Sequence, residues 1–98
     1  MAQNRVAKDY ARLRELLVTQ EQFPLEYLHK FIGRNTPAFD AGVQAWKDRH
    51  RPISCPSDRL SASQGHRSIT FVLQMATVDE LIAMLEATDA IPDLVIVL

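Results

Sequence analysis

The stretch that most constrains this chain is His66–Thr77, HRSITFVLQMAT, in which apolar and polar residues alternate except at Val72. The apolar positions are Ile69, Phe71, Leu73 and Met75, and the polar ones are Ser68, Thr70 and Gln74. A period of two is typical of a strand with one buried face. Thr77 and Glu80, a hydroxyl and a carboxylate three residues apart, then indicate a helix start. This stretch is therefore predicted to be a central strand of a small sheet.

Two helices and three further strands are predicted around it. Thr36 and Pro37 are typical of a helix N-cap and first turn, and apolar residues at helical spacing extend that helix to about His50. We expect Gly42 to bring this helix close to the sheet. A second helix is predicted from Val78 to about Thr88. The predicted strands are Tyr27–Ile32, Ile53–Ala62 and Leu94–Leu98, and Pro52 and Pro56 confine the second of these to a sheet edge.

These elements follow one another as a helix and then β-α-β-β-α-β, which predicts an α+β, ferredoxin-like fold. Its four-stranded antiparallel sheet would have the order 4-1-3-2, with both later helices on one face. Tyr27–Ile32 and Ser68–Met75 would be the central strands. An apolar stripe with helical spacing predicts an additional helix from about Val6 to Val18. We therefore divide the chain into a helical extension, residues 1–22, and a ferredoxin-like domain, residues 23–98.

Composition narrows the class of protein. The 98 residues suit one domain, and the single cysteine, Cys55, cannot form an internal disulfide. Without a signal-like or membrane-length apolar run, we expect a cytoplasmic protein with no membrane partner. The net charge of -1 argues against a nucleic-acid binder. All 11 Lys and Arg lie at or before Arg67, and only acids follow, which we interpret as solvated faces, with electrostatic pairing between them as the alternative.

No pattern in the sequence indicates catalysis, a cofactor or a metal. The histidines, His29, His50 and His66, fall on different elements without zinc-ligand spacing. His29 is expected on the inner face of its strand, packed and hydrogen-bonded. Cys55 lacks a nucleophile motif and is expected to be buried or idle, and no phosphate-binding glycine motif occurs. The sequence therefore predicts a non-enzymatic protein with no cofactor.

Two places are candidate binding sites. Gly33, Arg34, Asn35 and Thr36 lead into a helix N-terminus, where free N–H groups suit an anionic small effector. Leu94, Val95, Ile96, Val97 and Leu98 are expected to form an apolar edge strand without charge, proline or bulge, which favours pairing with a second copy. We thus expect a homodimeric regulatory or adaptor domain that binds an effector or a protein partner, the latter on the sheet or the first helix.

The alternative is a single-stranded RNA-binding module that uses the open face of the sheet. RNA-recognition modules share this topology and stack bases on aromatic residues of the central strands. Phe31 and Phe71 are instead expected to face inward, and the characteristic RNA-binding signature is absent. Lys30 is the residue on the open face whose replacement would weaken RNA binding.

Several short signatures in order resemble the YbeD-like family of small bacterial proteins of unknown function. They are Phe23-Pro24, His29-Lys30-Phe31-Ile32-Gly33, the Ser61–Gly65 turn, Ala76-Thr77 and Val97-Leu98. The resemblance extends from Phe23 to Leu98. It implies similarity to the ACT domain, a ferredoxin-like module that binds small ligands and dimerises, and it transfers no catalytic residue.

The chain departs from this family in the strand after Gly65. An ungapped alignment would place the family's small polar face on the four apolar residues of the alternating stretch. A shift of one residue swaps every side chain between the two faces of a strand. We predict such a shift, because the alternative would turn Gln74 into the core.

Overall fold

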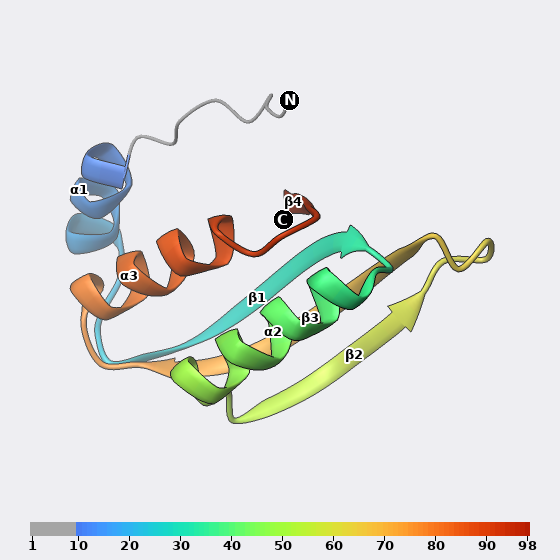
Figure 1. Cartoon of the computed structure of the whole chain (residues 1–98). Helices are drawn as coiled ribbons and strands as arrows, with labels where there is room; N and C mark the ends of the chain where they lie inside the picture. Colours follow the sequence, from blue (N-terminus) through green and yellow to red (C-terminus); the bar gives the residue numbers. More distant parts are fainter. Residues whose placement is uncertain (1–9) are drawn as a thin grey trace.

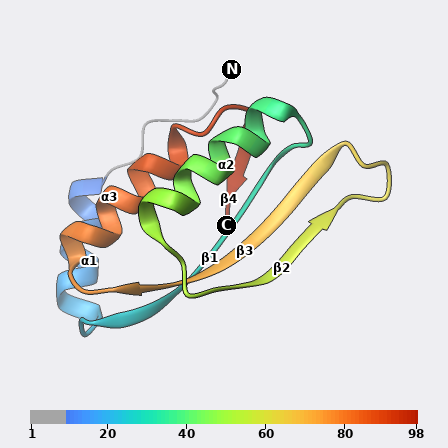
Figure 2. The ribbon, with the colours of Figure 1, turned by 60° about the horizontal axis from the view of Figure 1, so that its bottom comes forward.

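A computed structural model describes residues 10–98, and it is an α+β structure with a four-stranded antiparallel sheet (Figure 1). Its elements are α1 (Tyr10–Gln20), β1 (Leu25–Arg34), α2 (Pro37–His50), β2 (Ser54–Leu60), β3 (His66–Met75), α3 (Val78–Asp89) and β4 (Leu94–Val97). The strand order β2-β3-β1-β4 is the predicted order read from the other edge, and it is compatible with a ferredoxin-like arrangement. Helices α2 and α3 lie on the same face of the sheet (Figures 1 and 2).

The alternating stretch forms β3, which lies between β1 and β2 as predicted. Its apolar side chains face the helices, and all four are at most 3% exposed: Ile69, Phe71, Leu73 and Met75. The expectation that Gln74 stays out of the core is therefore confirmed, while a shift relative to the YbeD-like family stays a prediction. In β1 the inner face carries His29 opposite Phe71 and Phe31 opposite Ile69. These side chains, with Phe39, Val43 and Trp46 of α2 and Leu81 and Met84 of α3, make up the core.

Both later helices begin where the sequence predicts. The Thr36 hydroxyl accepts a hydrogen bond from the Phe39 N–H at 3.1 Å, and the Thr77 hydroxyl accepts one from the Glu80 N–H at 3.1 Å. The Glu80 carboxylate in turn accepts from the Ala76 N–H at 2.9 Å. These bonds satisfy N–H groups that have no partner within the helix.

Some predicted details differ from the structure. The first edge strand, Ser54–Leu60, is shorter than the predicted Ile53–Ala62, because the turn into β3 already begins at Ser61, whose carbonyl accepts from the Gln64 N–H at 2.8 Å. Within the strand the register shifts between Ser54 and Ser57, where Pro56 cannot donate to the ladder. The prediction for Gly42 was wrong about the neighbour. A side chain there would meet Pro92 at 2.9 Å and Ile91 at 3.1 Å, so this glycine lets α2 approach the α3–β4 turn and not the sheet.

Helix α1 continues two residues beyond the predicted end at Val18, and the predicted start at Val6 lies outside the described residues. It packs beside α3 through half-buried apolar side chains. Tyr10 donates a hydrogen bond to Asp89, and Arg14 forms an ion pair with Asp79. The acidic C-terminal part of the chain thus pairs in one place with the basic N-terminal part. None of the helices between residues 10 and 98 is long and apolar enough to cross a membrane.

Candidate functional site

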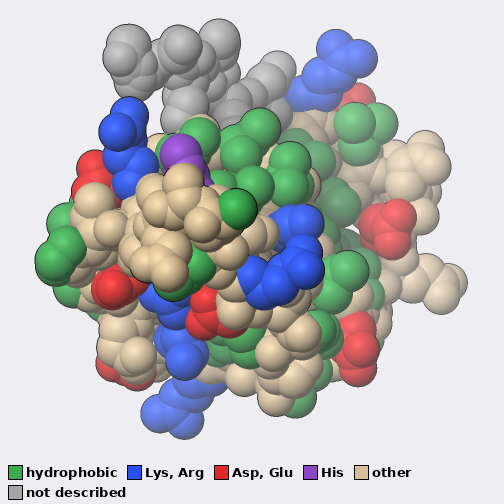
Figure 3. All heavy atoms as spheres, turned by 90° about the vertical axis from the view of Figure 1, so that its right-hand side faces the viewer, with side chains coloured by type: hydrophobic (Ala, Val, Ile, Leu, Met, Phe, Trp, Pro, Cys, Tyr) green, Lys and Arg blue, Asp and Glu red, His purple; other side chains and the backbone are tan. Residues whose placement is uncertain are grey.

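The predicted effector site, Gly33–Thr36, connects β1 to α2 at the end of the molecule that faces the viewer in Figure 3. Its Asn35 bonds to the turn between β2 and β3 twice: the backbone N–H donates to Gly65 O at 3.0 Å, and Nδ2 donates to Gln64 O at 2.9 Å. Basic and acidic side chains are interspersed over this end (Figure 3). The loop therefore fastens two turns together, and its surroundings do not concentrate positive charge for an anion.

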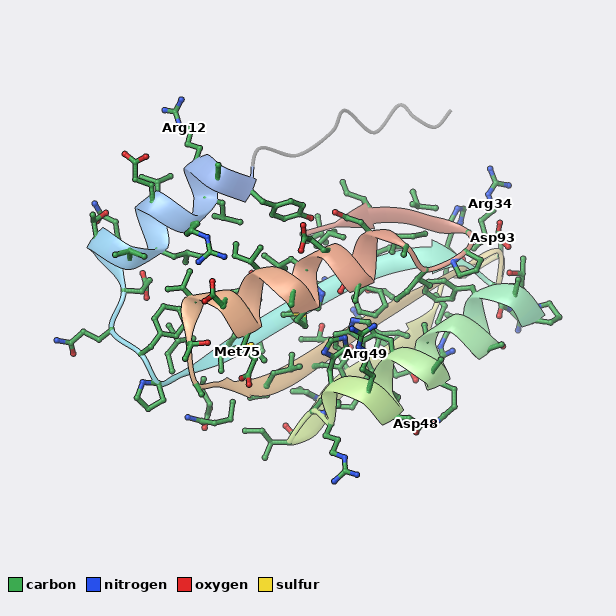
Figure 4. All side chains as sticks on the ribbon, turned by 60° about the vertical axis from the view of Figure 1, so that its left-hand side comes forward. Arg12, Arg34, Asp48, Arg49, Met75 and Asp93 are labelled. Carbon is green, nitrogen blue, oxygen red and sulfur yellow. The ribbon has the colours of Figure 1, made fainter. Side chains whose placement is uncertain are left out.

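The protein's own carboxylate lies at the start of α2. The Thr36 hydroxyl donates to Asp93 Oδ2 at 2.7 Å, and the Arg34 N–H donates to the Asp93 carbonyl at 2.9 Å. Figure 4 shows Arg34 and Asp93 together at this end of the molecule. A negatively charged effector would meet the Asp93 carboxylate there, and like charges repel at such distances. The geometry gives these residues a structural task, and effector binding stays a prediction.

Gly33 has a packing role within the same loop. A Cβ atom added to it would lie 2.1 Å from Cε1 of Phe39, a side chain with no exposed surface. Because Gly33 has no side chain, the Phe39 ring of α2 can pack directly against the backbone at the end of β1. This close approach, rather than contact with a ligand, accounts for the glycine.

The predicted dimer edge forms β4, which lies at the margin of the sheet next to β1, as expected. Leu94 and Val97 pack against the core. The other large side chains of this segment are exposed: Val95 by 44%, Ile96 by 45% and Leu98 by 60%. The edge carries no charged residue, as predicted, but the expectation of an edge without a bulge was wrong. Gly33 pairs with Leu94 and Ile32 with Ile96, so Val95 is an extra residue in β4.

The exposed apolar surface continues from β4 across the outer face of the sheet. Ile96 lies opposite Ile32 of β1, and Leu28 of β1 lies opposite Val72 of β3. We call this set of outer-face side chains the apolar strip: Leu28, Ile32, Val72, Ile96 and Leu98. Leu28 is 66% exposed, the highest value among the large apolar side chains of the sheet. No described helix covers this face (Figure 2).

The outer face lacks the groups that an RNA-binding sheet uses. Phe31 and Phe71 point into the core and are at most 1% exposed, as predicted. Among the described strand residues, none of those that share the outer face with Leu28 and Val72 is a Phe, Tyr or Trp. Base stacking on such side chains supplies much of the affinity for single strands. The structure therefore offers no feature that favours the RNA-binding alternative.

A buried polar network lies under this sheet, and sequence reasoning identified only its histidine. Trp46 Nε1 donates to the Thr88 hydroxyl at 2.9 Å, and His29 Nε2 lies 3.0 Å from the same oxygen. The Thr88 hydroxyl uses its single proton to donate to the Met84 carbonyl at 2.9 Å. Its oxygen can therefore only accept, and Trp46 Nε1 and His29 Nε2 both donate to it. His29 is fully buried and hydrogen-bonded, as predicted. Thr88 resembles an ordinary helix residue in the sequence, because its partners come from β1 and α2.

A second polar cluster joins α2 to the edge strand β2 and was also missed. Arg67 binds both carboxylate oxygens of Asp58, at 2.9 and 2.8 Å, and reaches Asp40 at 2.8 Å. The hydrogen bond from Arg67 lowers the pKa of Asp58, and the bond to Asp58 raises the pKa of Arg67. A cavity of about 430 Å³ opens beside these groups, with Lys47 on its wall. The guanidinium is already bound to two carboxylates, so the cluster's task is structural.

The remaining titratable and thiol groups do not converge. His50 ends α2 and packs on Trp46, with 5.2 Å between ring centroids; burial and the neighbouring Arg49 lower its pKa, and Glu80 opposes them. His66 lies on the outer face, far from His29. Cys55 is exposed on β2, so of the two expectations for this thiol the buried one is wrong, and the idle one stays a prediction. Within the described part of the chain, no three His, Cys, Asp or Glu side chains are placed to hold a metal ion.

Comparison with protein-family models, with curated proteins and with solved structures finds no match. The resemblance to the YbeD-like family therefore stays a prediction from the quoted residues. The most distinctive part of the protein's surface is the β4 edge with the adjoining apolar strip.

Proposed function

We propose that this protein is a non-enzymatic regulatory or adaptor domain, ferredoxin-like and similar to the YbeD-like and ACT-like domains, that acts by protein–protein association. Its first partner is a second copy of the same chain, and the two copies pair through β4. The carrying observation is the exposure of Val95, Ile96 and Leu98 on an edge strand that has no charge. Such an edge invites strand pairing unless something covers it.

The backbone of β4 supports this proposal. The Leu98 N–H donates to Lys30 O of β1 at 2.8 Å. In an antiparallel ladder, alternate residues direct their backbone groups to opposite sides, so the Val97 N–H and carbonyl point away from β1. A second β4 strand related by a two-fold axis could bond to these groups, and it would bring two apolar strips side by side. Symmetric pairing of this kind is the commonest route to a closed oligomer.

The contact strand is short, so we expect an association that dissociates on dilution. A stable interface usually buries about 800 Å² on each partner, more than a four-residue edge supplies without neighbouring side chains. Ile96 and Leu98 of the apolar strip would have to contribute to the contact.

Light scattering over a range of protein concentrations tests the proposal. The wild-type chain should approach twice its monomer mass of 11.1 kDa as concentration rises. Val95→Lys places a charge on the edge and should keep the protein monomeric. Val18→Lys is the matched control, because Val18 is an exposed valine on α1, 61% accessible, and should leave association unchanged. A wild-type mass that stays monomeric at every concentration would remove the proposal.

A further inference from the structure

A cavity of about 280 Å³ opens on the outer face of the sheet, beside the turn that joins β2 to β3. Strand pairing brings its walls together: Arg59 of β2 lies opposite Ser68 of β3, and Ser68 lies opposite Ile32 of β1. His66, two residues before Ser68, has its side chain on the same face of β3. We call this the hairpin cavity, and it is lined by Ile32, Arg59, Leu60, Ser61, His66 and Ser68.

The polar side chains of the hairpin cavity include donors that the protein does not use itself. Within residues 10–98, the side chains of Arg59, His66 and Ser68 form no hydrogen bond or ion pair. Arg67 differs, because its guanidinium on the helix side of the sheet is held by Asp58. The guanidinium, the hydroxyl and the imidazole of the cavity each have an N–H or O–H to donate. A ligand group with several acceptor oxygens would satisfy all three.

The charge around the hairpin cavity is positive, although the whole chain has a net charge of -1. The arginine of the cavity is joined on the same face by Lys30, two residues from Ile32. Among the described strand residues of the outer face, the acid is Glu26, six residues from Ile32 and so roughly 20 Å away along the strand. Arg34 lies beside Asp93 (Figure 4), so we assign it no part in the cavity. An anion in the cavity therefore meets cations without a competing carboxylate from the surrounding strands.

An apolar surface adjoins the unused donors. Ile32 is half-buried and lies opposite Ile96 of β4, and Leu60 is 49% exposed. A guanidinium binds two oxygens of one phosphate at once, and a phosphate monoester offers a third acceptor oxygen that a carboxylate lacks. No Phe, Tyr or Trp lines the cavity, so stacking of a nucleic-acid base is not favoured. The ligand that fits joins a phosphate to a short apolar group.

We propose that the hairpin cavity binds a phosphate monoester whose organic part is apolar. Arg59 donates to two of the phosphate oxygens, and Ser68 and His66 donate to the third. The organic part lies on Ile32 and Leu60. At neutral pH the monoester carries a charge of about -1.5 to -2, which the arginine and the nearby lysine of β1 attract.

This inference goes beyond the proposed dimer and does not rest on it. The dimer uses the margin of β4, whereas the donors of the hairpin cavity come from β2 and β3. Val95→Lys should therefore prevent association between copies and leave phosphate binding unchanged. Loss of one property without the other in that variant shows which of the two proposals fails.

Isothermal titration calorimetry of the full chain with hexyl phosphate tests the site. Inorganic phosphate lacks the apolar part, and hexanol lacks the anion. We expect hexyl phosphate to bind at least tenfold more tightly than either, because only this ligand occupies both parts of the cavity. In NMR spectra of the same titration, the Ser68 amide and the His66 ring should shift, and the Thr19 amide on α1 should not.

A pair of arginine variants shows whether the binding belongs to this cavity. Arg59→Gln removes the guanidinium from the cavity and should weaken the binding of hexyl phosphate at least tenfold. Arg49→Gln is the matched control, because Arg49 is an exposed arginine of α2 that forms no ion pair within the described residues. This control should leave the affinity for hexyl phosphate unchanged.

Three results of these measurements would overturn the proposal. Equal weakening in both arginine variants would mean that binding follows net charge. Equal affinity for hexyl phosphate and hexanol would mean that the phosphate contributes nothing, and shifts that miss Ser68 and His66 would place the ligand elsewhere. If Arg59→Gln fails to fold, the comparison of the ligands and the NMR shifts on the wild-type chain still decide.

Vesicles distinguish a lipid headgroup from a soluble phosphate as the source of this chemistry. Phosphatidic acid is a phosphate monoester, so phosphatidylcholine vesicles with and without it present the same group on a membrane. Binding to these vesicles that depends on Arg59, together with binding of hexyl phosphate, would assign the ligand to a lipid headgroup. Binding of hexyl phosphate alone would assign it to a soluble ester, and both results support the proposal. Binding to vesicles or to single-stranded RNA without binding of hexyl phosphate would overturn it.

Discussion

The two faces of the sheet come from the same strands and differ in what they require of their side chains. On the inner face, β1 and β3 bury Phe31, Phe71 and Leu73 against two helices. On the outer face, the intervening residues include Leu28 and Thr70, and no described helix covers them. The difference teaches that the period-two pattern serves two purposes here. One set of positions holds the fold together, and the other forms part of the surface.

The largest expected effect is at the inner face. Phe71→Ala removes a fully buried ring and should lower the free energy of unfolding by about 3–5 kcal/mol. Thr70→Ala, one residue earlier on the outer face, should lower it by about 1 kcal/mol or less, since the half-buried Thr70 loses only strand propensity and cross-strand contact. Urea denaturation of both variants measures the contrast. Similar losses at the two positions would mean that the outer face is also packed, which breaks the comparison.

The buried network under the inner face should give the next largest effect. Thr88→Val leaves the Trp46 and His29 nitrogens without their acceptor and should lower the free energy of unfolding by about 1–3 kcal/mol. Thr19→Val is the matched control, because the Thr19 hydroxyl makes the same type of bond, to Glu15 O at 3.0 Å, on an exposed helix face. If the two variants lose equally in melting temperature, burial does not determine how much the Thr88 hydroxyl contributes to stability.

Two ion pairs that differ in exposure, Arg67–Asp58 and Arg14–Asp79, extend the comparison to charged groups. Arg67→Gln breaks the two-oxygen contact with Asp58 and should lower the free energy of unfolding by about 1 kcal/mol at neutral pH. Because Arg67 lowers the pKa of Asp58, the wild-type advantage is present above the ordinary value of 3.8 and is lost as pH falls through the lowered pKa. Arg14→Gln, at a more exposed pair with Asp79, should change little. An Arg67 variant whose deficit persists unchanged in acid would contradict this assignment.

The smallest expected effect concerns His50, at the border between the helix layer and solvent. Its lowered pKa means that the unfolded state binds a proton more readily, so this group's stabilisation is present above 6.5 and declines as pH falls below it. His50→Gln should flatten the pH dependence of the melting temperature in that window. If the melting temperature depends more steeply on pH in the variant, burial and Arg49 do not lower the pKa of His50, which would contradict this prediction.

Local patterns accounted for much of the fold because local physics sets those features. The N-cap at Thr36, the start at Pro37 and the inner face of β3 depend on neighbours within a few residues. The shift in the pairing with β4 between Ile32 and Gly33 depends on how two distant segments align. No spacing in the sequence encodes that alignment.

The candidate sites show the same division. The exposed apolar edge at Leu94–Leu98 was predictable, because one uncharged segment carries the signal. The bonds from Asn35 to Gly65 and from Thr36 to Asp93 were not, since each partner comes from a different turn. Those bonds explain why a loop that is typical of an anion site in sequence has a structural task in the fold.

Hydrogen exchange at two neighbouring amides of β4 tests the central claim, that this edge is the surface for self-association, most directly. The Leu98 N–H bonds to Lys30 O within the chain and should be protected at every protein concentration. The Val97 N–H points away from β1 and should exchange quickly in dilute solution and slow at least tenfold as concentration rises. A Val97 amide that exchanges quickly at all concentrations, beside a protected Leu98, would contradict the account.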